Sequence, residues 1–173
     1  MNVLSKFKPI KTFVFDVDGV LTDGTLWLLQ DGQQVRNMNI KDGYALQLAI
    51  TKGYRVLILS GGKSEPVKNR LDKLGIKDCF MQLTDKKQKL LAYVEQYGLK
   101  KEEILFMGDD IPDLAAMQQS GLPVCPADAV PEIREISIYI SPLPGGKGCA
   151  RDVIEKVLKL NGHWDIENQI LSQ

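Results

Sequence analysis

Two aspartates, Asp16 and Asp18, stand one residue apart, directly after a short apolar run and directly before Gly19. A buried carboxylate costs free energy unless another group pairs with it. A carboxylate can act as a nucleophile toward phosphorus, and a second carboxylate can carry the protons of the leaving group and of the attacking water. The pair therefore has the residue types that phosphoryl transfer through an aspartyl-phosphate requires.

Further polar residues end a second apolar run and begin a helix-like segment. Ser60 ends the run and is followed by Gly61 and Gly62, and Lys86 begins a segment with helical periodicity. Taken alone, the serine and glycines are typical of a loop, and the lysine is typical of a solvated helix residue. Together with the aspartates they offer a hydroxyl group and a positive charge to the oxygens of a phosphoryl group.

A third apolar run leads into another group of carboxylates. Asp109 and Asp110 follow Gly108, and Asp113 comes about one helical turn later. Carboxylates that share one crevice repel one another unless a cation lies among them. Because hard oxygen ligands favour Mg²⁺, these aspartates predict a magnesium site.

The elements that must position these residues alternate along the chain. Amphipathic, helix-like segments separate the apolar runs, which predicts one α/β domain with a Rossmann-like, doubly wound parallel sheet. Ligands of such sheets bind beyond the carboxyl ends of the strands, so Asp16, Ser60 and Asp109 are expected to converge. The strand-like runs are 12–17, 54–60 and 104–110, with weaker ones at 122–126 and 137–141, and the helix-like segments are 43–53, 64–75 and 85–98.

Residues 25–40 depart from this alternation. They read as two strands around Asp31 and Gly32, a common two-residue turn, so we expect a small β-hairpin inserted after the first strand. Trp27, Leu28 and Leu29 make this hairpin too apolar to stand alone in water. It needs a surface to pack on, either the parent domain or another copy of the chain.

The composition excludes several classes of partner. The formal net charge is zero, which does not favour nucleic acid or an anionic membrane surface. Apolar runs are too short to span a bilayer, and the N-terminal residues lack the apolar core of a signal peptide. Three widely spaced cysteines form no metal-ligand pattern and favour a reducing, cytoplasmic location; they are Cys79, Cys125 and Cys149.

The order of the polar residues resembles the four motifs of the haloacid dehalogenase superfamily of phosphatases. The matching stretches are "DVDGVLTDG", then Ser60, then Lys86, then "GDDIPD". Lys87 and Lys89 lie close by, but the "TDK" context favours Lys86. The resemblance implies the following roles: Asp16 is the nucleophile, Asp18 is the general acid/base and binds the metal through its carbonyl group, Ser60 and Lys86 hold the phosphoryl group, Asp109 completes the Mg²⁺ site, and Asp110 and Asp113 support it.

The chain has no room for the cap domain that is usual in this superfamily. It resembles the capless branch, the 3-deoxy-D-manno-octulosonate 8-phosphate phosphatases of lipopolysaccharide sugar biosynthesis, through "NIKDGYAL" (39–46) and the glycine-rich tail 144–173. The resemblance implies a homotetramer whose hairpins pack at the centre and whose tails reach neighbouring active sites, although the tail glycines also suit a plain flexible connection. It further implies substrate contacts from Gly61, Gly62, Lys63, Arg70, Lys41 and Asp42, with Arg70 holding the substrate carboxylate.

One departure affects the choice of substrate. Many octulosonate phosphatases have an arginine where this chain has Gly62, and the glycine is expected to leave open space there. Relatives that act on nine-carbon keto-deoxy sugar acids share the scaffold and remain an alternative. The "KDGY" stretch (41–44) matches the eight-carbon family better.

Two readings without catalysis also remain. A phosphoacceptor receiver domain has an acidic pocket, a lysine and Mg²⁺, but its acceptor aspartate ends a later strand than the first. A regulatory domain that has lost catalysis would not need the intact set of aspartates.

Overall fold

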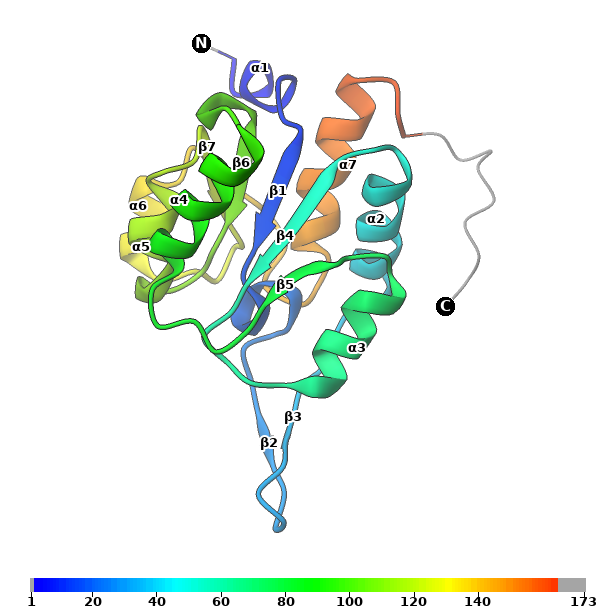
Figure 1. The fold of residues 1–173 in the computed structure, drawn as a ribbon, viewed down its shortest axis with the longest axis vertical. Coiled ribbons are helices and arrows are strands. Elements are labelled where there is room, and N and C mark those ends of the chain that lie inside the picture. Colours follow the sequence, from blue (N-terminus) through cyan, green and yellow to red (C-terminus); the bar gives the residue numbers. More distant parts are fainter. Residues whose placement is uncertain (1, 165–173) are drawn as a thin grey trace.

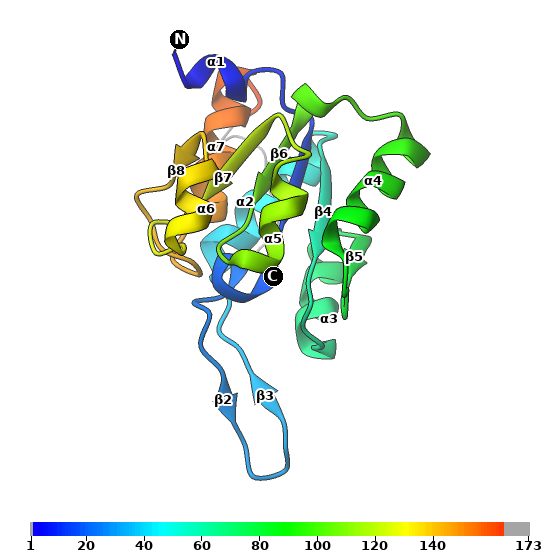
Figure 2. The same cartoon turned by 90° about the vertical axis from the view of Figure 1, so that its left-hand side faces the viewer.

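A six-stranded parallel sheet forms the centre of the computed structural model, which describes residues 2–164. Its strand order is β5-β4-β1-β6-β7-β8, so the chain builds one half of the sheet outward from β1 and then returns to build the other half from β6 (Figure 1; β8 is labelled in Figure 2). The strands are β1 (Thr12–Phe15), β4 (Arg55–Leu59), β5 (Asp78–Phe80), β6 (Ile104–Met107), β7 (Leu122–Cys125) and β8 (Tyr139–Ile140). This is the doubly wound sheet that the sequence predicts.

Helices cover both faces of the sheet, and side chains alternate along each strand between the two cores. Phe13 and Phe15 face one core, while Val14 between them faces the other. The first face carries α1 (Leu4–Phe7), α2 (Ile40–Thr51), α3 (Glu65–Lys73) and α7 (Cys149–Leu160), and the second carries α4 (Lys86–Tyr97), α5 (Ile111–Met117) and α6 (Pro131–Ile136). Burial on both faces explains why the central strands are continuously apolar.

The helix boundaries follow local chemistry. Ser64 and Asp85 accept hydrogen bonds from the backbone of the first turns of α3 and α4. Gly98 adopts a left-handed conformation after α4, with φ of 60°. These signals are visible in the sequence, and the helices predicted at 64–75 and 85–98 are confirmed.

The hairpin projects away from the sheet as two short antiparallel strands, β2 (Trp27–Leu28) and β3 (Gln34–Val35) (Figure 2). Within the described chain it makes little contact with the domain, so Trp27 is 65% exposed and Leu28 is 74% exposed. The hairpin predicted at 25–40 is present, but its last residue, Ile40, is the first residue of α2.

The segment predicted as a glycine-rich tail contains a core helix. Residues 149–160 form α7, which packs against α2 and buries Val153, Ile154 and Val157 completely. The periodic apolar residues of "VIEKVLKL" (153–160) are the sequence signal for this helix. Residues 165–173 of the predicted tail lie outside the described residues.

No helix in the described part of the chain combines the length and the apolar character needed to cross a membrane.

The three cysteines are free thiols, and two of them, Cys125 and Cys149, are buried. They pack as small apolar side chains.

Candidate active site

The carboxyl ends of β1, β4 and β6 open into a pocket of about 350 Å³. It lies where the strand order reverses between β1 and β6, the position at which doubly wound sheets bind ligands. The structure brings together Asp16, Asp18, Ser60, Lys86 and Asp109 in its lining. Gly61, Gly62, Asp110 and Asp113 also line it.

The turn that follows β1 depends on Gly19. This residue has φ of 86°, and a Cβ atom on it would come within 1.9 Å of Oδ2 of Asp109. Thr22 is fully buried, and its hydroxyl oxygen accepts hydrogen bonds from the backbone N–H groups of Gly19 and Gly24. The glycine after the two aspartates therefore allows the carboxylates that follow β1 and β6 to approach each other.

Lys86 joins two buried carboxylates. Its Nζ atom lies 2.9 Å from Oδ1 of Asp16 and 2.6 Å from Oδ1 of Asp113, and the lysine side chain is 5% exposed. Of the neighbouring lysines, Lys87 is exposed, and Lys89 lies over the ring of Phe80. The geometry therefore agrees with the choice of Lys86 among the three.

Burial and crowding shift the acidities in this cluster. Burial and the nearby Asp113 raise the pKa of Asp16 to about 7, although Lys86 acts in the opposite direction. Burial alone would lower the pKa of Lys86, but Asp16 and Asp113 raise it above its usual value. Lys86 therefore stays charged, but it does not offset the burial of Asp16 and the repulsion from Asp113, so Asp16 holds its proton more tightly than a free carboxyl group does.

Asp109 shows what kind of group this site would accept. Its Oδ1 atom is buried and has no hydrogen-bond partner among the described residues. Burial, with the repulsion of Asp16, Asp113 and Asp110, raises its pKa to about 8. A buried carboxylate oxygen without a partner costs free energy that a hard cation would recover.

The donor set fits Mg²⁺. One oxygen each from Asp16, Asp109 and Asp113 lies within 4.8 Å of the others. Both oxygens of Asp113 are already engaged, one by Lys86 and one by the backbone N–H of Asp109 at 3.1 Å. Asp16 and Asp109 are therefore the carboxylates left to hold the ion, and Asp113 orients its neighbours.

Ser60 is placed by the backbone at the end of β4. It is 1% exposed, and its Oγ accepts a hydrogen bond from the N–H of Gly62 at 3.1 Å. Asp110 lies at the exposed rim, where its side chain accepts a hydrogen bond from the N–H of Ile111 at the start of α5.

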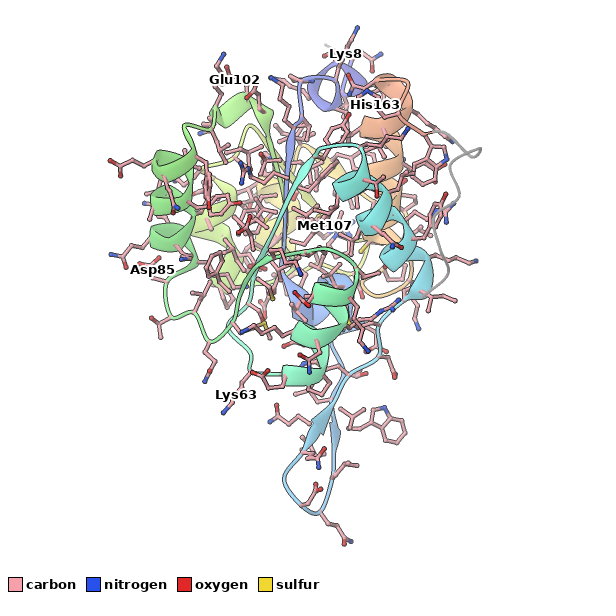
Figure 3. The ribbon with its side chains drawn as sticks, turned by 45° about the vertical axis from the view of Figure 1, so that its right-hand side comes forward. Lys8, Lys63, Asp85, Glu102, Met107 and His163 are labelled. Carbon is pink, nitrogen blue, oxygen red and sulfur yellow. The ribbon has the colours of Figure 1, made fainter. Side chains whose placement is uncertain are left out.

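The other predicted substrate contacts do not line this pocket. Lys63 is exposed and points away from the molecule (Figure 3), and Lys41 lies beside α7. Asp42 is buried and accepts a hydrogen bond from the N–H of Arg151 at 2.8 Å, so it stabilises the start of α7. Arg70, on α3, lies over Gly43 of α2.

Arg36 is a pocket neighbour that the sequence analysis missed. It follows β3 and forms an ion pair with Asp18, with 2.6 Å between Nε and Oδ1. The expectation of open space at Gly62 is wrong, because a Cβ atom there would lie 2.9 Å from Oδ2 of Asp18 and 3.2 Å from Nη2 of Arg36. No local sequence signal links a residue of the hairpin to the aspartates.

The raised acidities predict how Mg²⁺ binding depends on pH. Both pKa values lie above the usual value of 3.8, so between about pH 4 and pH 8 the folded protein holds protons that the unfolded chain has released. Without metal, these groups therefore lower the free energy of unfolding as the pH rises through that range. Mg²⁺ must displace the same protons. Its affinity should therefore weaken about tenfold for each unit by which the pH falls below these pKa values, for each proton displaced.

The measurement is the increase in melting temperature caused by Mg²⁺. It should be larger at pH 8.5 than at pH 6, and Asp109→Asn should remove most of it. An equal increase at both pH values would contradict the assignment of Asp16 and Asp109 as ligands.

Comparison with known proteins identifies the family that the chain resembles. The family model of haloacid dehalogenase-like hydrolases matches residues 38–121. The chain is 31% identical to the Escherichia coli K12 3-deoxy-D-manno-octulosonate 8-phosphate phosphatase KdsC over 164 residues, which are 95% of this chain and 87% of KdsC.

Solved structures show the same likeness. A probable YrbI family phosphatase from Pseudomonas syringae is 36% identical, with a TM-score of 0.90 over 94% of this chain and 92% of its own. The Moraxella catarrhalis 3-deoxy-D-manno-octulosonate 8-phosphate phosphatase, solved with a magnesium ion, a phosphate ion and a KDO molecule, is 32% identical, with a TM-score of 0.87 over 91% of each chain.

These likenesses run through nearly the whole length of the chain. They set aside the receiver and regulatory-domain readings, because the similar proteins are phosphatases with the same fold. The chain therefore belongs to the 3-deoxy-D-manno-octulosonate 8-phosphate phosphatase family of the haloacid dehalogenase superfamily and is a phosphoric monoester hydrolase.

Proposed function

We propose that this phosphatase hydrolyses 3-deoxy-D-manno-octulosonate 8-phosphate to the free sugar acid and phosphate, with Mg²⁺, in lipopolysaccharide sugar biosynthesis. The observation that carries the proposal is the buried Asp16–Lys86–Asp113 chain beside the unpartnered oxygen of Asp109. The names of the relatives supply the substrate class. Three free cysteines are in keeping with a reducing cytoplasm as the site of this reaction.

The first step forms a bond to Asp16. Its Oδ1 accepts hydrogen bonds from the N–H of Val17 at 2.7 Å and from Lys86, which leaves Oδ2 as the attacking oxygen. As the bond from Oδ2 to phosphorus forms, the ester bond breaks, and Asp18 gives a proton to the departing sugar oxygen. Ser60 and Lys86 hold the phosphoryl oxygens.

The second step releases phosphate. Water attacks the phosphorus of the aspartyl-phosphate, Asp18 takes the proton of that water, and the bond between phosphorus and Asp16 breaks. Asp16, Asp109 and the carbonyl oxygen of Asp18 would hold Mg²⁺, which would supply positive charge beside the phosphoryl oxygens.

The test is phosphate release from a panel of sugar phosphates. We expect the eight-carbon 8-phosphate to have a higher kcat/KM than nine-carbon keto-deoxy acid 9-phosphates, because "KDGY" (41–44) suits the eight-carbon family. One charged hydrogen bond separates related substrates by about one to two powers of ten. A ratio that favours the nine-carbon acid would replace the substrate and leave the phosphatase mechanism unchanged.

The assembly is part of the proposal. A cluster of apolar side chains lies exposed on the hairpin and at its base. Contiguous apolar surface of this kind is typical of a surface that binds another protein chain. These side chains are Leu26, Trp27, Leu28, Leu29, Val35 and Ile40. We place the hairpins at the centre of a homotetramer, in which Arg70, Lys41 and the glycine-rich segment 144–148 would serve neighbouring sites.

Charged residues on the hairpin should dissociate this assembly. Trp27→Glu with Leu29→Glu should give a smaller species in sedimentation and a higher KM for the sugar phosphate, because burying two carboxylates in the interface would cost several kcal/mol. Leu91→Glu is the matched control, since Leu91 is a comparably exposed leucine on α4. A double variant that sediments like the unmodified chain, or a fully active monomer, would refute this arrangement.

A further inference from the structure

One charged side chain at the base of the hairpin, Arg36, reaches the catalytic pocket. Arg36 contacts Asp18 through two hydrogen bonds, from Nε to Oδ1 at 2.6 Å and from Nη2 to Oδ2 at 3.2 Å. Its Nη1 also donates to the backbone carbonyl oxygen of Gln34 at 3.4 Å. The guanidinium group therefore grips both oxygens of the carboxylate from a fixed position at the base of the hairpin.

This contact differs from an ordinary surface ion pair. The Arg36 side chain is 4% exposed, whereas the Asp18 side chain is 36% exposed toward the pocket. An exposed ion pair is worth little, because water screens it and both side chains lose freedom. A bidentate pair with one partner buried holds the carboxylate of the other partner in one orientation.

Gly62 explains how the guanidinium group reaches this place. Its backbone does not have the positive φ that favours glycine. A Cβ atom there would lie 2.9 Å from Oδ2 of Asp18 and 3.2 Å from Nη2 of Arg36. Space, and not backbone conformation, keeps this position free of a side chain, and Arg36 fills that space.

We propose that Arg36 is the positioning residue for the Asp18 carboxylate, and that Gly62 makes room for its guanidinium group. The hairpin then has a second task besides packing: it holds the acid/base group of the pocket. The inference rests on the proposed role of Asp18, and not on which sugar acid is the substrate.

The first experiment separates positioning from binding. Arg36→Ala should lower kcat for the sugar phosphate about 100-fold, as expected when a reacting group is misplaced by about 1 Å, with KM changed less than about threefold. Arg36→Lys should recover part of the loss, because one charged donor remains. Gln33→Ala is the control, since Gln33 lies on the same hairpin and, among residues 2–164, its side chain bonds only Asp31.

A burst measurement excludes a merely structural effect. 4-Nitrophenolate leaves without needing a proton, so in Arg36→Ala its first-turnover burst should stay within about threefold of the unmodified enzyme while steady-state turnover falls. Sedimentation should show an unchanged assembly. If burst and steady state fall together, or if turnover is unchanged or rises, the proposal is wrong.

Two double-variant cycles complete the test. In an Asp18→Asn background, Arg36→Ala should cost less than about threefold, because its target is gone. Gly62→Ala should lower the turnover of the unmodified enzyme, and it should lower turnover by a smaller factor in the Arg36→Ala background. In the Gln33→Ala background, by contrast, Gly62→Ala should lower turnover by the same factor as in the unmodified enzyme. Full additivity of Arg36→Ala with Asp18→Asn would overturn the proposal. All comparisons use whichever phosphate ester the unmodified enzyme hydrolyses best, so a wrong substrate assignment would not be mistaken for failure of this inference.

Discussion

Asp16→Asn should abolish turnover, with a loss of several powers of ten in kcat, because removing a nucleophile stops the reaction at its first step. The amide has the shape of the carboxylate. Its oxygen can keep the hydrogen bonds that Oδ1 accepts from the N–H of Val17 and from Lys86, while the nitrogen takes the place of the attacking Oδ2. The variant should therefore fold, and only its chemistry should fail.

The measurements are phosphate release and the melting temperature. Asp72→Asn is the matched control, because Asp72 is an exposed carboxylate whose one ion pair within the described residues is with Lys77; it should keep full activity. Turnover by Asp16→Asn within tenfold of the unmodified enzyme would refute the assignment of the nucleophile. A variant that has lost its cooperative unfolding transition would instead give Asp16 a structural role.

Lys86→Met should damage both stability and catalysis. The methionine side chain fills a similar volume but leaves Asp16 and Asp113 buried without their shared cation. Breaking a buried ion pair by removing one partner costs about 3–5 kcal/mol in the free energy of unfolding. Without Lys86 the pKa of Asp16 should rise further, so the loss of stability should grow as the pH rises through the neutral range.

Lys87→Met provides the control in the neighbouring residue. Lys87 is exposed, so its replacement should leave the melting temperature and kcat nearly unchanged. Denaturant unfolding of both variants at pH 6 and pH 8.5, together with phosphate release, measures the difference. Equal effects of the two substitutions, or full activity in Lys86→Met, would contradict the place of Lys86 in the site.

The sequence by itself determined the type of sheet and the position of the main polar groups. Apolar runs followed at once by Asp16, Ser60 and Asp109 can be read as strands with polar carboxyl ends, and in a parallel sheet such ends lie on one edge. Helix periodicity and capping residues act over a few neighbouring residues, so α3 and α4 could also be predicted. These features depend on short-range chemistry.

The tertiary structure decided which side chains actually touch. Asp42 accepts a hydrogen bond from the N–H of Arg151 at the start of α7, more than 100 residues later in the chain. Arg36 was not singled out, and Gly62 was expected to leave open space that the guanidinium group in fact fills. Contacts between distant segments depend on how whole elements pack, and no local pattern encodes the distance between a hairpin and a strand end. For that reason the sequence predicts the chemistry of this site, whereas only the tertiary structure shows that Arg36 contacts the carboxylate of Asp18.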